Sequence, residues 1–275
     1  FVKFIQGMKN NGIDIYAVSP QNEPLNKGNC ASTYIPWKEE ADFVKVLAAT
    51  FKKNSLKTKI YLFDHNFNYE NSFTQNDYPI KIYNALGDSY EGSEYVVGAA
   101  YHNYGGNPEE LDDVHAKAPT KELIFSETSI GTWNDGRNLT ARLLNDMRDV
   151  TFATVKAVLV WNLMLDKNMG PNLDGGCQTC FGAVDIDQNG YKQLHYNSHY
   201  FIICHMSSVV NPGAVRIGTT SDSAKLSDFS HVEFINPDGT KAMVLLNTGD
   251  RDRIITISDG QNHFRCRIPT GSIVS

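Results

Sequence analysis

The chain has 275 residues, of which 41% are hydrophobic and 20% charged, and its formal net charge is -6. This composition is that of a globular protein large enough to bury a sizeable core. The net acidity, with no run of Lys or Arg, argues against a nucleic-acid-binding surface, which needs a basic footprint. No apolar stretch approaches the roughly 20 residues that span a bilayer.

Strands and helices are predicted to alternate over the first 210 residues. Short apolar runs predict five strands, at 13–18, 59–63, 95–100, 122–126 and 157–160. Helical spacing of apolar residues predicts helices at 1–11, 37–51, 78–86, 108–116, 138–150 and 196–206. In the helix over 138–150, Asn138 fits a glycosylation sequon, but capping of the helix is favoured. This alternation predicts a parallel sheet buried on both faces, with polar and aromatic residues at the active-site end of a barrel.

The sequence pattern changes beyond residue 208, where helical spacing of apolar residues is no longer found. Short runs separated by turn signals predict strands at 215–219, 232–235, 243–246, 254–257 and 264–268. Asn236-Pro237-Asp238-Gly239 is one such turn signal. The sequence therefore predicts two domains, a barrel portion over 1–210 and an antiparallel β-sandwich portion over 211–275.

Two glutamates lie at the carboxyl ends of predicted strands. Glu23 lies in the segment 19–24, where prolines on either side restrict the backbone. Glu127 follows an apolar strand, where burial of a carboxylate is costly without a partner or a task. Each has an ordinary alternative, an exposed loop Glu for the first and an ion-paired Glu for the second. Together at a barrel mouth they match hydrolysis of a glycosidic bond, which needs a carboxylic acid and a carboxylate flanking the bond.

Other polar and aromatic residues follow the neighbouring strands. His102 and Tyr104 end the strand between the two glutamates and could hydrogen-bond a carboxylate nucleophile. Asn22 could hold a substrate hydroxyl beside Glu23, and the face of Trp161 could stack on a sugar ring. The alternatives are ordinary packing at a barrel rim for the aromatics and a core position for Trp161.

The cysteines and the paired histidines indicate no metal site. Cys177 and Cys180 have C-x-x-C spacing, but no second pair completes a zinc ribbon, so a local disulfide or paired thiols are favoured over zinc or redox chemistry. His195 and His199 have i,i+4 spacing, but Tyr196 stands where a zinc protease needs Glu. Packing of the pair on a helix surface is therefore favoured over metal binding.

The motifs together resemble glycoside hydrolase family 30, which includes glucosylceramidases and endo-β-1,6-glucanases. The similarity is carried by Ser19-Pro20-Gln21-Asn22-Glu23-Pro24, Phe125-Ser126-Glu127, Trp161-Asn162-Leu163-Met164-Leu165-Asp166, Gly170-Pro171-Asn172 and the tail Ile268-Pro269-Thr270-Gly271-Ser272. The resemblance implies that Glu23 is the acid/base and Glu127 the nucleophile of a retaining mechanism, with carboxyl groups roughly 5 Å apart. It assigns substrate binding to Asn22, His102, Tyr104 and Trp161.

The resemblance also sets expectations for fold, partners and compartment. The implied fold is an incomplete (β/α)8 TIM barrel, strands 4 to 8, followed by a small antiparallel β-sandwich portion. The implied substrate is a β-glucoside, β-1,6-glucan or glucosylceramide, with no cofactor, no metal, no nucleic acid and no membrane span, and a secreted or periplasmic location. Asn103 departs from the Trp expected in lysosomal-type members, which weakly favours a β-glucan or β-glucoside over a glycolipid.

The start of the chain departs most from the family pattern. Glu23 belongs at the end of the fourth strand of the family's barrel, so strands 1 to 3 are expected in a longer protein of which this chain is the C-terminal part. Open barrel edges would expose apolar strands, and self-association through them is an expected consequence. The alternative function is that of a non-catalytic carbohydrate-binding fragment.

Overall fold

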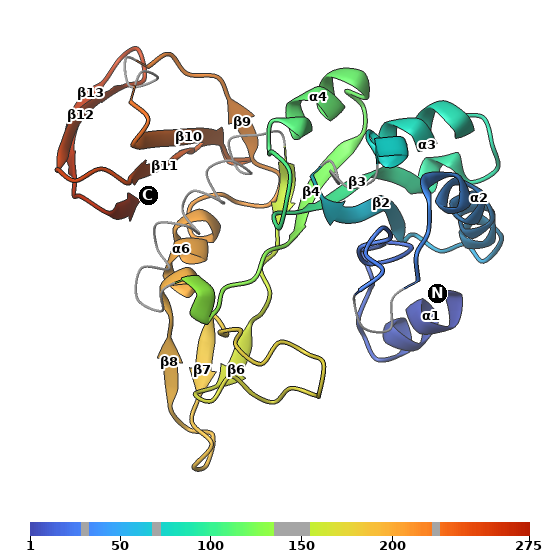
Figure 1. Ribbon diagram of the computed structural model, residues 1–275. Helices are drawn as coiled ribbons and strands as arrows, with labels where there is room; N and C mark the ends of the chain where they lie inside the picture. The colour runs from blue at the N-terminus through green and yellow to red at the C-terminus, as the bar shows by residue number, and fades with distance from the viewer. Residues whose placement is uncertain (29–32, 68–72, 135–154, 222–225) are drawn as a thin grey trace. The chain divides into compact units, whose positions relative to one another are not determined.

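The computed structural model describes residues 1–28, 33–67, 73–134, 155–221 and 226–275 (Figure 1). The chain divides into two compact units, Phe1–Thr128 with Ala153–Val160, and Ser129–Phe152 with Trp161–Ser275. The predicted helix over 138–150 and its cap Asn138 lie outside the described residues. Among the described helices, none is long and apolar enough to cross a membrane.

The first unit is a parallel sheet with helices between its strands. Its strands, in the order β1-β2-β3-β4-β5, are Ala17–Val18, Lys59–Asn66, Val96–His102, Glu122–Glu127 and Val155–Val158, and every neighbouring pair is parallel. Its helices are α1 (Val2–Asn10), α2 (Trp37–Lys53), α3 (Tyr78–Leu86) and α4 (Glu110–Lys117), with 3-10 turns at Phe73–Gln75 and Ser93–Tyr95. The predicted barrel-type sheet is confirmed. β1 and β5 form its edges, and self-association through them stays a prediction.

The apolar pattern of α2 explains how this helix covers the sheet. Val44, Ala48 and Phe51 are fully buried, at the i, i+4, i+7 spacing of one helix face. The strand β2 is buried along nearly its whole length, because both faces of a parallel sheet are covered.

Two strands differ from their predicted extent in ways that matter for the site. The run predicted over 13–18 pairs only at Ala17–Val18, so β1 is a short edge strand. β2 continues three residues past Phe63, but its register shifts between Phe63 and His65. Phe63 and Asp64 have φ values of 73° and 51°, which turn the backbone out of the regular strand conformation.

The second unit contains three short strands that the sequence did not predict, together with a 3-10 turn at Thr132–Asn134. β6 (Met164–Asp166), β7 (Val184–Ile186) and β8 (Leu194–Tyr196) form a three-stranded sheet within the Gly-rich region. α6 (Ser198–Ser207) begins two residues later than predicted and buries His199 and Ile202. The prediction that His195 and His199 share a helix is wrong, because His195 lies on β8.

The C-terminal part is antiparallel, as predicted. Its four-stranded sheet runs β14-β11-β10-β9, formed by Ser272–Val274, Lys241–Asn247, Phe229–Ile235 and Val215–Ile217, and β12 (Arg253–Ser258) pairs with β13 (His263–Ile268). Figure 1 shows this part in orange and red. Phe229, Leu245 and Ile268 form its buried cluster. β14 was not predicted from the sequence.

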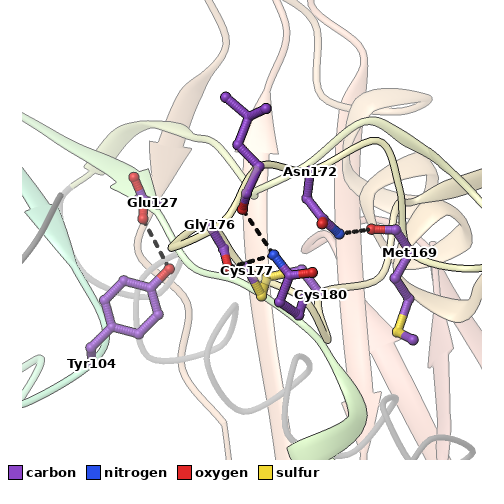
Figure 2. Close-up of a disulfide and its surroundings, with 9 residues drawn as sticks. Tyr104, Glu127, Met169, Asn172, Gly176, Cys177 and Cys180 are labelled. Atoms are coloured by element: carbon purple, nitrogen blue, oxygen red, sulfur yellow. Dashed lines mark hydrogen bonds between the residues drawn. A yellow bond between two sulfur atoms is a disulfide. The ribbon is translucent and has the colours of Figure 1, made fainter. Parts of the chain in front are cut away.

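A disulfide joins Cys177 and Cys180, one of the two alternatives that the sequence favoured (Figure 2). The residues around it also hold the loop by hydrogen bonds. Gln178 Nε2 donates to the carbonyl oxygen of Leu173 at 2.9 Å. Phe181 N donates to the carbonyl oxygen of Ile130 at 2.7 Å, so the loop is tied to a second segment of its own unit.

Candidate active site

Glu23 is held by contacts on its backbone and its side chain. It lies in the loop that follows β1, with φ of 49°, and its N–H donates to the carbonyl oxygen of Asp64 at 2.9 Å. Asn26 Nδ2 donates to Glu23 Oε2 at 2.6 Å, and His102 Nδ1 lies 3.3 Å from Glu23 Oε1. Glu23 is 7% exposed, so its carboxyl group is a buried polar group with specific partners and not an exposed loop side chain.

His102 lies between two carboxyl groups. It is the last residue of β3 and is 1% exposed. Its Nδ1 faces Glu23, and its Nε2 lies 3.1 Å from Asp64 Oδ1. The imidazole ring at the end of β3 therefore connects Asp64 on β2 with Glu23 in the loop after β1.

Asp64 is a member of this cluster that sequence reasoning missed. Ser19 Oγ donates to its Oδ2 at 2.5 Å, and Ser126 Oγ donates to its Oδ1 at 2.6 Å. The signal that could have found it is its position directly after the predicted strand 59–63, because Glu127 follows the predicted strand 122–126 in the same way.

Charge coupling across the cluster shifts its pKa values. Burial lowers the pKa of His102, but its hydrogen bonds and charge interactions with Asp64 and Glu23 outweigh burial and raise it to about 9. Burial raises the pKa of both Glu23 and Asp64, but the hydrogen bonds from His102 and other donors leave each pKa below its ordinary value. The resting arrangement is an imidazolium between two carboxylates.

Glu127 lies at the end of β4 in a different environment. Tyr104 donates its hydroxyl proton to Glu127 Oε1 at 3.1 Å, as Figure 2 shows. Burial raises the pKa of Glu127, and the negative charges of Glu23 and Asp64 add to this, so the opposing effects of His102 and Tyr104 do not bring it back to its ordinary value. Of the two candidate catalytic carboxyl groups, Glu127 is the one that holds a proton more tightly in the resting site.

The directions of these two pKa shifts are opposite to those that the roles implied by the resemblance would favour. An acid/base residue must carry a proton when the bond breaks, and a nucleophile must be ionised. In the resting site the pKa of Glu23 is lowered and that of Glu127 is raised. Glu23 is therefore a carboxylate in the resting site and needs a proton before it can act as an acid.

Glu40 is a buried residue of α2 that holds the backbone next to Asp64. Its Oε1 accepts the N–H of Phe63 at 2.9 Å, where β2 leaves its regular register just before Asp64. The hydroxyl of Tyr78 lies 2.8 Å from both the carbonyl oxygen of Ile35 and Glu40 Oε2. Because a hydroxyl has one proton, both contacts are satisfied when Tyr78 donates to Ile35 and a protonated Glu40 donates to Tyr78. Burial raises the pKa of Glu40 to about 7, consistent with this neutral form.

The remaining predicted residues, Asn22 and Trp161, occupy different surroundings. Asn22 is exposed beside Glu23. His65, which was not predicted, is buried next to Asp64 with its pKa lowered to about 4, chiefly by burial. Trp161 belongs to the second unit, where it is 53% exposed and bridges Ser129 through the backbone. Its part in sugar binding stays a prediction, whereas its alternative as a core Trp is wrong because the ring is exposed.

The cluster has the chemistry of a carboxyl-based site. Within the part of the chain that the structure describes, no three His, Cys, Asp or Glu side chains form a group able to hold a metal ion. Three carboxyl groups, one imidazole and one phenol lie at the carboxyl ends of parallel strands. Groups of these kinds transfer protons and attack an electrophilic carbon.

The chain is similar to known glycoside hydrolases. The chain is 29% identical over 286 residues to the endo-1,6-beta-D-glucanase BGN16.3 of Trichoderma harzianum, covering 100% of this chain and 54% of that protein. It is 25% identical over 303 residues to the putative glucosylceramidase 1 of Caenorhabditis elegans, again covering 100% and 54%. The chain thus spans about half the length of the curated relatives it matches.

A solved structure titled the endo-beta1,6-glucanase BT3312 is 54% identical and superimposes with a TM-score of 0.91, over 99% of this chain and 60% of that one. The model of the glycosyl hydrolase family 30 TIM-barrel domain matches residues 1–210, and the model of that family's beta sandwich domain matches residues 213–275. Since these two matches account for almost every residue, the chain belongs to glycosyl hydrolase family 30.

Proposed function

We propose that the protein hydrolyses β-glucosidic bonds with retention of configuration. The observation that carries the proposal is the placement of Glu23 and Glu127 at the carboxyl ends of strands of one parallel sheet, coupled through His102. Glu127 attacks the anomeric carbon, and Glu23 protonates the leaving oxygen and then activates water. The hydroxyl of Tyr104 and the charge of His102 favour the ionised form of Glu127 that attack requires.

The proposed substrate is a β-1,6-glucan. Two proteins that this chain resembles are named endo-1,6-glucanases, one of them 54% identical. Glucosylceramidases are matched at 25% to 27% identity. The higher identity supports a polysaccharide over a glycolipid. Asn103 agrees with this, because it stands where lysosomal-type members are expected to have Trp.

Hydrolysis of linear β-1,6-glucan tests this function, with β-1,3-glucan and glucosylceramide as comparison substrates. We expect reducing sugar from β-1,6-glucan at a rate at least tenfold above either comparison. Proton NMR of the first product should show the β-anomer before mutarotation. Release of the α-anomer would contradict retention, and binding without hydrolysis would favour the carbohydrate-binding alternative.

Separate variants test the two roles. Glu23→Ala should lose activity on glucan but retain much of it on an aryl glucoside whose leaving group needs no proton, and azide should rescue it as a β-glucosyl azide. Glu127→Ala should be inactive on both, and azide rescue should give the α-azide. The opposite pattern would exchange the two roles.

We further propose that the protein acts outside the reducing cytosol. The Cys177–Cys180 disulfide supports this, because structural disulfides persist in oxidising compartments. Thiol labelling of protein recovered from its native source should find both cysteines blocked, and free thiols at both would contradict it.

A further inference from the structure

We propose that Asp64, His102 and Glu23 form a relay in which His102 stores the proton that Glu23 delivers to the leaving group, and Asp64 holds that proton on His102. This inference rests on the proposed function and adds two positioning residues, Asp64 and His102, to the two catalytic carboxyl groups.

The geometry of the ring suits a stored proton. Both ring nitrogens of His102 face carboxyl oxygens, at 3.3 Å from Glu23 and 3.1 Å from Asp64. When both carboxyl groups are ionised, a neutral imidazole would turn a lone pair toward one of them, whereas an imidazolium donates to both. When the proton moves to Glu23, its O–H donates to Nδ1 and the same contacts remain satisfied. The ring is 1% exposed, so water cannot substitute for either contact.

Asp64 is built as a fixed anion. Its oxygens accept hydrogen bonds from Ser19 and Ser126, which can be satisfied without a proton on the carboxyl group. Its carbonyl oxygen accepts the N–H of Glu23, so one residue fixes both the ring and the backbone of the acid/base. The Asp64 carboxylate accepts hydrogen bonds from Ser19, Ser126 and His102 and donates none. It therefore orients the His102 ring and stabilises the positive charge on it.

The charged and titratable groups around His102 come from every neighbouring strand end. They are Glu23 beyond β1, Asp64 and His65 on β2, Tyr104 beyond β3, and Glu127 on β4. His65 is neutral at working pH, since its pKa is about 4. The imidazolium is therefore stabilised chiefly by Asp64 and Glu23, and more weakly by Glu127.

The proton transfers balance over one catalytic cycle. The Nδ1–H bond of His102 breaks as an O–H bond forms on Glu23, and Glu23 then gives that proton to the leaving glycosidic oxygen. Glu23 is left as a carboxylate and His102 as a neutral imidazole that still donates Nε2–H to Asp64. In the second half-reaction Glu23 takes a proton from the attacking water and returns it to His102.

Nitrogen-15 NMR titration of the His102 ring tests the relay without any substrate. Its signal is identified by its loss in His102→Gln. We expect the wild-type ring to titrate near pH 9, and Asp64→Asn to lower that pKa by about 1–2 units, because an anion within hydrogen-bond distance is removed. Asn suits the left-handed backbone at this position, where φ is 51°. Asp64→Glu restores the charge and should recover at least half of the shift.

His231 provides an internal control in the same spectra. It pairs with Glu233 in the second unit and should titrate identically in all variants. A change there would report a general loss of structure, in which case Asp64→Glu, with its charge retained, decides the question.

The pH profile of kcat/KM is the second measurement. Deprotonation of the relay abolishes activity, so the alkaline limb follows the His102 pKa and should move to lower pH by about 1–2 units in Asp64→Asn. A merely structural role would lower activity equally at every pH. An unmoved limb, or a His102 pKa that changes by less than about half a unit, would overturn the relay. Absence of any hydrolysis by the wild type would overturn the proposed function instead, and the NMR titration would still decide whether Asp64 holds the proton on His102.

Discussion

The two ends of the parallel sheet carry polar clusters of opposite character. At the carboxyl ends, Glu23, Asp64 and Glu127 surround a single imidazole, His102. At the amino ends, one carboxylate, Glu122, receives hydrogen bonds or ion pairs from Lys59, Lys156 and the hydroxyl of Tyr61. One end has an excess of acids and the other an excess of bases, on the same strands.

The pKa shifts show what each end is built for. At the amino end burial acts against ionisation, yet Lys156 and Tyr61 lower the pKa of Glu122, and Glu122 raises that of Lys156, so each ordinary charge is reinforced. At the carboxyl end the charges of His102, Glu23 and Asp64 are reinforced in the same way, because the pKa of His102 is raised to about 9 and those of the two acids are lowered. Glu127 differs, because burial raises its pKa and opposes its ionisation. A carboxyl group whose ionisation is opposed, beside a cluster of charges, is a candidate for a functional role.

Exchanging Glu for Gln at the two ends of β4 gives the largest expected difference. Glu127→Gln should lower kcat at least about 10⁴-fold, because an amide cannot attack the anomeric carbon. Its free energy of unfolding at pH 7 should stay level or rise, since a group whose pKa is raised by burial destabilises the fold when ionised.

The matched control is Glu122→Gln, on the same strand at the other end. It should leave kcat within a few-fold and lower the free energy of unfolding by about 1–2 kcal/mol, because two ammonium groups lose their common carboxylate. Urea unfolding and glucan hydrolysis of both variants measure this exchange. Loss of activity in the control, or retention of it in Glu127→Gln, would remove the distinction between the two ends.

The next largest expected effect is that of Glu40 on how the free energy of unfolding depends on pH. Its folded pKa is about 7 against 4.5 for the ordinary group, so the folded state binds more protons between these values. The stability that protonated Glu40 contributes to the fold is therefore fully present below about pH 4.5. It is lost as the pH rises through 7, and the free energy of unfolding falls by about 3 kcal/mol in total.

Unfolding of Glu40→Gln against wild type at pH 5 and pH 8 measures this loss. The amide should remove most of the difference between the two pH values. Glu39→Gln, at an exposed position of the same helix, should leave it unchanged. An identical pH dependence in wild type and Glu40→Gln would mean that the carboxyl group is ionised in the folded protein.

The sequence predicted both catalytic candidates and His102 between them, but not Asp64, the second carboxyl group on the His102 ring. Glu23 and Glu127 follow apolar runs, and that pattern is local. Asp64 joins the site because the backbone at Phe63 and Asp64 leaves the regular strand, with Glu40 accepting the freed N–H. This depends on a buried carboxyl group 23 residues away in the sequence, which no local pattern reports.

The barrel-type sheet and the antiparallel C-terminal part were predicted correctly, but the three short strands of the Gly-rich region were missed. β6, β7 and β8 have three residues each, too few for an alternating pattern to stand out from a Gly-rich region. The strand predicted over 13–18 was too long, because its apolar residues Ile13 and Tyr16 are exposed, so the run marks an apolar surface and not a buried strand.

The smallest expected effect concerns Lys156 at the amino end. Its side chain is 48% exposed, so its 2.6 Å contact with Glu122 is screened by solvent. Lys156→Met should lower the free energy of unfolding by less than about 1 kcal/mol, because Lys59 still pairs with Glu122. Urea unfolding at low salt and at 1 M salt measures this, and the difference from wild type should shrink at high salt, where the Debye length is about 3 Å. Hydrolysis should be unaffected at either salt concentration. A loss above about 2 kcal/mol that persists at high salt would show that the amino end is as tightly coupled as the carboxyl end, and burial rather than chemistry would then explain the shifted pKa values at both.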